Sequence, residues 1–139
     1  MMVFKKNNGI SALPTVLIIS MVVVEVSVVS VVLANAFNNT RFGERLAREA
    51  YSVARAGAED AILRVLRYKD CPSTPNCPAS YSLAVGSKNA AVTIANTNGV
   101  VTIRSTGSVL LRSKGVEAVL GVNTDTGEVS LQSFGEVAL

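Results

Sequence analysis

A long apolar stretch near the start of the chain limits what this protein can fold into more than any other feature does. From Ile10 to Phe37 the only ionisable side chain is that of Glu25, and the stretch is rich in Val and Ile. About 20 helical residues, each rising about 1.5 Å, cross the hydrocarbon core of a bilayer. In lipid, only a helix or a closed barrel satisfies the backbone. The stretch therefore predicts a membrane-crossing helix over residues 10–37.

A short basic segment precedes this stretch. Met1–Gly9 carries Lys5 and Lys6, and a basic segment before an apolar one is typical of either a cleaved signal peptide or a retained anchor. The positive charges are expected to hold this segment in the cytoplasm and to send the rest of the chain outward. Pro14 suits the first turn of the helix, because the N–H that proline lacks has no helical acceptor there.

Residues 38–70 carry the strongest helical pattern in the chain. Apolar and small side chains recur at three- or four-residue spacing, which predicts an amphipathic helix with a stripe rich in Ala and Gly that packs closely on a sheet or another helix. The stripe consists of Phe42, Leu46, Ala50, Val53, Gly57, Ala61 and Val65. Ion pairs between residues four apart, each worth about 0.3 kcal/mol, are expected at Glu44–Arg48, Arg45–Glu49, Arg55–Glu59 and Asp60–Arg64.

The segment 71–139 consists of short runs rich in Val, Ile and Thr that are separated by turn residues. The runs "AAVTIAN" and "VVTIRST" flank Asn98-Gly99, which predicts a hairpin. A second hairpin is expected between "SVLLR" and "VEAVLGV", through "SKG" and Gly115, and "NTDTG" turns the chain into "EVSLQSF". We therefore predict an α+β fold in which four or five antiparallel strands pack with one face on the Ala-rich stripe.

Two cysteines, Cys71 and Cys77, lie in the loop "CPSTPNC" that follows the second helix. Pro72, Pro75 and Pro78 prevent the helix from continuing through this loop. A bridge between the cysteines needs an oxidising compartment, whereas in a reducing compartment they are two free thiols. The membrane segment upstream favours the oxidising side and hence the disulfide.

Composition argues against several classes of function. The chain has no His, and its 13 basic and 10 acidic residues leave a formal net charge of +3. Without His, the cysteines predict no zinc site and the serines and threonines have no activating base, so we expect no metal, no cofactor and no enzyme activity. The acidic neighbours of the helical arginines favour a solvated or intersubunit face over nucleic-acid binding. These arginines are Arg41, Arg45, Arg48, Arg55, Arg64 and Arg67.

With this organisation the chain resembles the type IV pilin and pseudopilin superfamily, with a class III-type leader. The leader "KKNNG" followed by "ISALPTVLIIS" carries the resemblance, and the pattern from "VTIRSTG" to "EVSLQSF" is similar to the headgroup of pilin-like proteins. The resemblance implies that a prepilin peptidase cleaves between Gly9 and Ile10, that Ile10 becomes an N-methylated terminus, and that the apolar helix packs into a fibre core. Residues 1–9 are then the leader, 10–37 the core helix, 38–70 the amphipathic helix and 71–139 the headgroup.

The chain departs from the family pattern near the processing site. Pro14 occupies the fifth position of the processed chain, where the family usually has a Glu that is thought to pair with the terminal amine of a neighbouring subunit. Ile10 stands where Phe is more usual, and Asn7 and Asn8 separate the lysines from Gly9.

Glu25 lies near the middle of the apolar stretch, where a charged side chain costs about 3 kcal/mol on insertion scales. One interpretation is that Glu25 replaces the missing acid and meets a cation, such as the terminal ammonium of Ile10, on a neighbouring helix. Within one helix these two residues are about 22 Å apart, so the partner must belong to another chain. The other interpretation is a tolerated acid, either neutral or hydrogen-bonded to a serine such as Ser20 or Ser27.

Together with these observations, the resemblance implies a structural subunit of a type IV pilus-like filament. Its expected partners are membrane lipid, identical or sibling pilins, the prepilin peptidase and the pilus assembly machinery. The subunit is expected in the cytoplasmic membrane before assembly and in an extracellular filament at the cell surface afterwards, where its sheet sets properties such as adhesion. The alternative is a single-pass, membrane-anchored extracytoplasmic binding module that does not polymerise.

Overall fold

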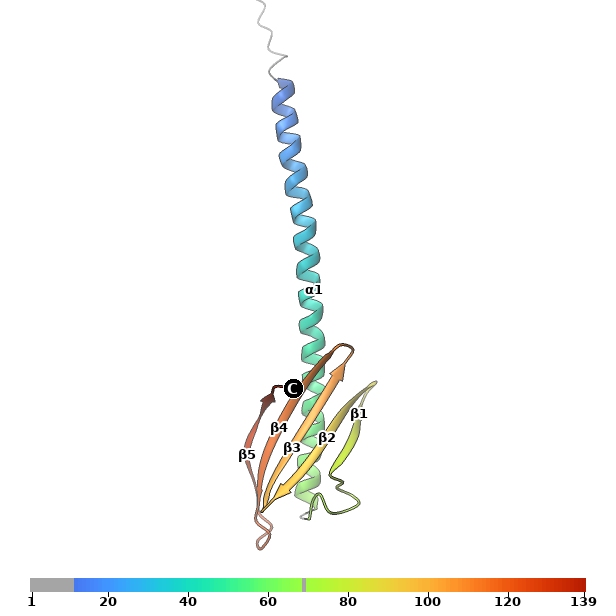
Figure 1. Ribbon diagram of the computed structural model, residues 1–139, viewed down its shortest axis with the longest axis vertical. Helices are drawn as coiled ribbons and strands as arrows, with labels where there is room; N and C mark the ends of the chain where they lie inside the picture. The colour runs from blue at the N-terminus through green and yellow to red at the C-terminus, as the bar shows by residue number, and fades with distance from the viewer. Residues whose placement is uncertain (1–11, 69) are drawn as a thin grey trace, which may run out of the picture. The chain divides into compact units, whose positions relative to one another are not determined.

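The computed structural model describes residues 12–68 and 70–139 (Figure 1). One helix is followed by five strands. These elements are α1 (Ala12–Arg67), β1 (Ser80–Val85), β2 (Lys88–Thr97), β3 (Val100–Val109), β4 (Arg112–Val122) and β5 (Val129–Val137). The chain divides into two compact units, Met1–Arg41 and Phe42–Leu139, and the division falls within α1.

In the first unit, α1 is built largely from Val, Ile, Leu, Ala and Ser. Such β-branched residues favour strands in water. A helix nevertheless satisfies every interior backbone group within its own segment, which a single apolar strand does not do. Pro14 is the third residue of α1 and lies in its first turn, where its missing N–H removes no helical hydrogen bond.

The second unit contains a five-stranded antiparallel sheet in the order β1-β2-β3-β4-β5, so each strand pairs with the next along the chain. The predicted α+β fold is therefore confirmed. The expected β2–β3 hairpin is also present: Thr97 pairs with Val100, and Asn98 and Gly99 form the turn with φ values of 53° and 82°. Asn and Gly tolerate positive φ, and a turn of this kind matches the twist of the paired strands.

The strands differ from the prediction in two places. β1, with the sequence "SYSLAV", is an additional strand, and its extended conformation is stabilised by pairing with β2. The predicted turn through "SKG" and Gly115 is wrong, because β3 continues to Val109 and the turn falls at Leu110–Leu111. Gly115 instead pairs with Thr106 inside the ladder. Two leucines carry no turn signal, whereas the nearby Ser, Lys and Gly do.

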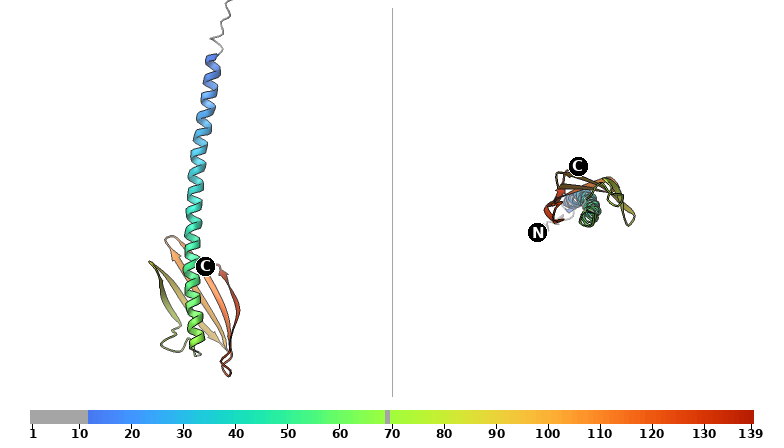
Figure 2. Two further views of the ribbon diagram at one scale, coloured as in Figure 1. Left: turned by 180° about the vertical axis from the view of Figure 1, so that it is seen from behind. Right: turned by 90° about the horizontal axis from the view of Figure 1, so that it is seen from below.

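The part of α1 in the second unit lies across one face of the sheet, which curves around it (Figure 2). The predicted Ala-rich stripe is buried there against Val and Ile side chains of the strands. Buried helix residues are Ala50, Val53, Ala54, Gly57, Ala58, Ala61 and Val65, and buried sheet residues include Ala90, Val92, Ile94, Val101, Ile103, Val116, Ala118 and Leu120. Phe42 was expected on this stripe, but its side chain is exposed, about two turns before the first buried helix residue.

Two glycines allow the helix and the sheet to approach closely. A Cβ atom on Gly57 of α1 would lie within 3.0 Å of the side chains of Ala90 and Val92. A Cβ atom on Gly107 of β3 would overlap the helix backbone at Ala50 and Ala54. The small residues of both elements therefore set the distance between helix and sheet, because larger side chains would push the two apart.

Candidate functional site

The apolar part of α1 in the first unit presents its side chains to the outside. From Leu13 to Leu33, the exposed fractions of its Val, Ile, Leu and Met side chains lie between 52% and 69%. A helix that is apolar on all sides needs lipid or other protein around it, because so much apolar surface is unfavourable in water. The segment is long and apolar enough to cross a membrane, as the sequence predicts.

Three serines of this segment, and Thr40 beyond it, donate hydrogen bonds to the backbone of their own helix. Ser20, Ser27 and Ser30 each donate a hydrogen bond to the carbonyl oxygen four residues earlier, with oxygen–oxygen distances of 2.7–2.8 Å. Thr40 donates in the same way to the Ala36 carbonyl at 3.0 Å. A hydroxyl that is bonded to its own helix needs no water, which lowers the cost of placing it among apolar groups.

Glu25 lies on the exposed surface of the same segment. Its carboxylate forms no hydrogen bond or ion pair with the part of the chain that the structure describes. Ser20 and Ser27 donate their hydroxyl protons to the carbonyls of Val16 and Val23, so neither donates to Glu25. The carboxylate is therefore available to a partner outside this chain.

The residues of the predicted processing site lie outside the described residues. They are Lys5, Lys6, Gly9 and Ile10, so cleavage after Gly9 and N-methylation of Ile10 stay predictions. Pro14, which stands where the resemblance implies a Glu, is among the described residues. It lies in the first turn of α1, a position that proline commonly occupies.

The expected disulfide between Cys71 and Cys77 is present and closes a small loop after α1. Both cysteines are buried in the core of the second unit. The Cys71 carbonyl accepts a hydrogen bond from Asn96 Nδ2 of β2 at 3.2 Å, which ties the loop to the sheet. The Cys71–Pro72 peptide bond is cis. The disulfide belongs to the packing of this unit and places no reactive thiol on its surface.

A charged network joins α1 to the cysteine loop and to β1. Asp60 accepts hydrogen bonds from Tyr81 Oη at 2.6 Å and from Arg64 Nε at 2.8 Å. Burial raises the pKa of Asp60, but these two bonds outweigh burial, so the pKa lies below its ordinary value. Burial and the bond to Asp60 raise the pKa of Tyr81 well above its ordinary value. Arg64 also stacks over the Tyr81 ring and donates to the Asn76 carbonyl. Helical spacing predicts the Asp60–Arg64 pair, but Tyr81 reaches it only through the tertiary fold.

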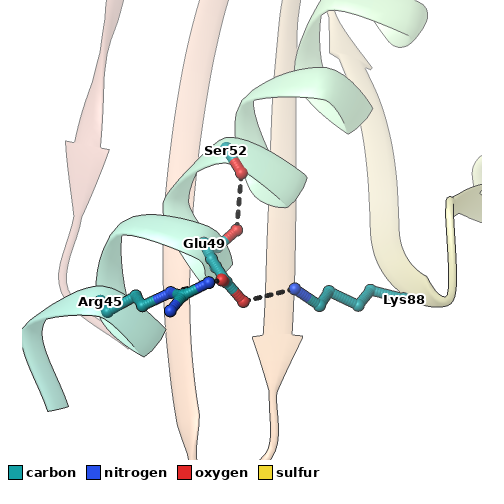
Figure 3. Close-up of polar contacts among 4 residues, drawn as sticks. All are labelled: Arg45, Glu49, Ser52 and Lys88. Atoms are coloured by element: carbon teal, nitrogen blue, oxygen red, sulfur yellow. Dashed lines mark hydrogen bonds and ion pairs between the residues drawn. The ribbon is translucent and has the colours of Figure 1, made fainter. Parts of the chain in front are cut away.

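Glu49 links α1 to the first residue of β2, Lys88. Its carboxylate accepts a hydrogen bond from Lys88 Nζ at 2.5 Å and lies 3.4 Å from Arg45 Nε (Figure 3). The Lys88 ammonium lowers the pKa of Glu49 below its ordinary value, and Arg45 adds to this effect. Ser52 donates to the Glu49 carbonyl at 2.8 Å. Three of the predicted helical ion pairs are confirmed: Arg45–Glu49, Arg55–Glu59 and Asp60–Arg64.

The apolar segment is thus the strongest candidate for function. In residues 12–68 and 70–139, no group of three or more His, Cys, Asp or Glu side chains is placed to hold a metal ion. The polar networks of the second unit connect its own elements to one another. Comparison with known proteins finds no matching family model, no matching curated protein and no matching solved structure.

Proposed function

We propose that the protein is a structural subunit of a type IV pilus-like filament, held in the cytoplasmic membrane by the apolar part of α1 before assembly. The observation that carries this proposal is a contrast within one chain. The second unit has a hydrophobic core of its own, whereas the large apolar side chains that the structure describes between Leu13 and Phe37 are all at least half exposed. Such a segment needs apolar surroundings that other molecules supply.

Assembly would exchange one apolar environment for another. In the membrane, lipid surrounds the segment between Leu13 and Leu33, and in a filament the same segments of identical or sibling chains surround it. Serines bonded to their own helix suit both environments, because they need no water. The second unit then lies on the outside of the fibre, where its sheet contributes surface properties such as adhesion.

Processing after Gly9 would begin the mature chain at Ile10 and place a terminal ammonium at the start of the apolar helix. In the filament, Glu25 of one chain would pair with such an ammonium on a neighbour. The Glu25 carboxylate has no partner among the described residues, which supports a contact between chains. An opposite charge offsets the cost of a carboxylate among apolar groups.

The intact mass of the native protein tests this function. A filament subunit is expected to lack residues 1–9, with or without one added methyl group, and electron micrographs should show fibres labelled by an antibody against the second unit. A chain that retains residues 1–9 and occurs only as single molecules in the cell envelope would instead be a membrane-anchored binding module. That result would overturn the filament proposal.

The substitution Glu25→Gln tests the pairing of chains separately. It keeps the shape of the side chain and removes its charge, so we expect normal membrane insertion but fewer fibres. Ser27→Ala is the matched control, since it changes another polar group of the same segment, whose hydroxyl bonds to the Val23 carbonyl of its own helix. Equal fibre numbers in Glu25→Gln and wild type would show that the Glu25 charge is not needed between chains. The filament proposal itself would still be decided by the intact mass.

A further inference from the structure

One turn of the sheet differs from the others in the residue that it places at positive φ. The other turns use Gly86, Asn98, Gly99 and Gly127 at positive φ. These residue types adopt that conformation at little cost. The turn between β3 and β4 instead places Leu110 at φ 53°. A bulky side chain there is unfavourable, because its Cβ approaches the carbonyl oxygen that follows it.

The same turn presents both of its leucine side chains to solvent. Leu110 is 79% exposed and Leu111 is 99% exposed, the two highest values among the large apolar side chains of the described residues. We call Leu110–Leu111 the dileucine turn. Backbone strain and apolar exposure coincide here, and each is unfavourable for the isolated unit. Together they indicate that the turn makes a contact outside the unit.

The dileucine turn lies at the end of the second unit where the chain enters from the apolar segment. Arg112 directly follows the turn, and its guanidinium lies beside α1, where a Cβ atom on Gly43 would be 3.5 Å from Nη2. The β1–β2 turn lies at the same end of the sheet (Figure 1). Gly43 is six residues beyond Phe37, the last residue of the apolar stretch, so the chain separates them by at most about 22 Å. The covalent chain therefore keeps Gly43, beside which Arg112 lies, within about 22 Å of the end of the apolar stretch.

Among the cations of β2, β3 and β4, which the structure describes throughout, Arg112 is the one without an ion pair. Lys88 is paired with Glu49, and Lys114 is paired with Glu136. Arg112 forms no ion pair with any residue that the structure describes. Two exposed leucines next to an unpaired guanidinium match the layers of an anionic lipid surface, where apolar chains lie beneath phosphate groups.

We propose that the dileucine turn is a second membrane contact of the unassembled subunit. Leu110 and Leu111 enter the lipid surface, and Arg112 binds the phosphate of an anionic headgroup. This inference rests on the membrane anchorage in the proposed function. The contact holds the second unit against the membrane until assembly removes the chain from lipid.

A single introduced tryptophan tests this contact, because the natural chain has none. The full-length Leu111→Trp variant is reconstituted at low density in vesicles of phosphatidylcholine and phosphatidylglycerol, with and without lipids brominated near the headgroup. We expect emission at shorter wavelength than in water and quenching by the brominated lipid. Thr124→Trp is the matched control, since Thr124 lies exposed in the turn between β4 and β5, at the other end of the sheet. It should show neither effect.

Adding Arg112→Gln to the Leu111→Trp variant should reduce quenching in vesicles with phosphatidylglycerol and leave it unchanged in pure phosphatidylcholine. If the chain floats with the vesicles but its tryptophan is not quenched, the lipid contact is overturned and the anchorage stands. Emission that shifts to shorter wavelength without quenching means that a second copy covers the turn, which also overturns the lipid contact. A chain that does not float with vesicles overturns both the contact and the anchorage.

Discussion

Two stretches of the same helix, residues 13–37 and residues 42–67, depend on different partners. The first is apolar on all sides and exposed. The second has a narrow stripe of small residues buried against the sheet, with charged residues on its exposed face. The two stretches carry different side chains because each must suit different surroundings. Lipid accepts large side chains on every side, whereas a sheet in the same chain accepts only side chains that fit its surface.

The small residues of the second stretch stabilise the unit through close contact more than through buried area. An Ala side chain removes little apolar surface from water compared with Leu or Ile. The approach at Gly57 and Gly107 brings many backbone and side-chain atoms of helix and sheet into contact, and their dispersion energies add up. The first stretch has no such partner in the described chain, so its burial depends on other molecules.

The largest expected effect breaks the packing of the second stretch. Gly107→Ala should lower the free energy of unfolding by about 3 kcal/mol, because the added Cβ meets the helix backbone at Ala50 and Ala54, which cannot rotate away. Urea unfolding in detergent measures it through tyrosine fluorescence, since all three tyrosines lie in the second unit. Gly135→Ala is the matched control, with open space around the new Cβ, and should change stability by less than about 0.5 kcal/mol. Equal effects of the two variants would contradict the close approach at Gly107.

A charge introduced into the first stretch should impair membrane insertion and leave the stability of the second unit unchanged. Val22→Lys is expected to cost about 3 kcal/mol in membrane insertion and to leave the unfolding of the second unit unchanged. The integrated fraction after carbonate extraction measures insertion, and tyrosine fluorescence measures unfolding. Val22→Leu should insert normally. Loss of the second unit's stability in Val22→Lys would show that the two stretches are not independent.

A smaller effect on the free energy of unfolding is expected at the hydrogen bond between Tyr81 and Asp60, near the end of the second stretch. Tyr81→Phe removes a hydrogen bond to Asp60 and should lower the free energy of unfolding by about 1 kcal/mol at neutral pH. The pKa of Asp60 is lowered in the folded state, so its contribution is present above the unfolded pKa of about 4 and is lost as pH falls through the folded value. The difference between variant and wild type should therefore narrow below about pH 4. Tyr68→Phe makes the same chemical change without removing a bond to Asp60, and an effect of equal size there would argue against the network.

The smallest expected effect concerns the dileucine turn, whose two side chains are more exposed than any large apolar side chain of the first stretch. Leu110→Gly should raise the free energy of unfolding in detergent by about 0.5 kcal/mol. Relief of the left-handed conformation contributes about 1 kcal/mol, and the greater freedom of unfolded glycine offsets about half of it. Leu111→Gly is the matched control, because Leu111 does not have a positive φ, and it should bring no gain. A loss of stability in Leu110→Gly would mean that the leucine is packed rather than strained.

Residue patterns alone predict much of this molecule. The apolar stretch around Glu25, the Ala-rich stripe and the Asn98-Gly99 turn are all local signals, because each depends on spacing or turn chemistry within a few residues. The bridge between Cys71 and Cys77 follows in the same way from short spacing and the expected compartment. The apolar helix of the candidate site could therefore be located without any knowledge of the fold.

Other features could not be predicted, because they depend on pairing between distant segments. β1 has a weak pattern of its own and becomes a strand through its register with β2. The dileucine turn has the composition of a strand and becomes a turn because the ladder between β3 and β4 extends to Val109 and Arg112. Tyr81 and Lys88 reach Asp60 and Glu49 from 21 and 39 residues away, distances at which helical spacing says nothing.

The amino-acid sequence by itself determined that this chain has an apolar helix in need of lipid or neighbouring helices, and a separate α+β unit. It did so because hydrophobic periodicity and turn chemistry act over a few residues. Only the tertiary structure decided how closely the second stretch of α1 approaches the sheet and which cations of the strands pair with acids of the helix. It also decided that two leucines are exposed at a turn. These outcomes depend on contacts between residues that are distant in the chain, and such contacts exist only once the strands are in register.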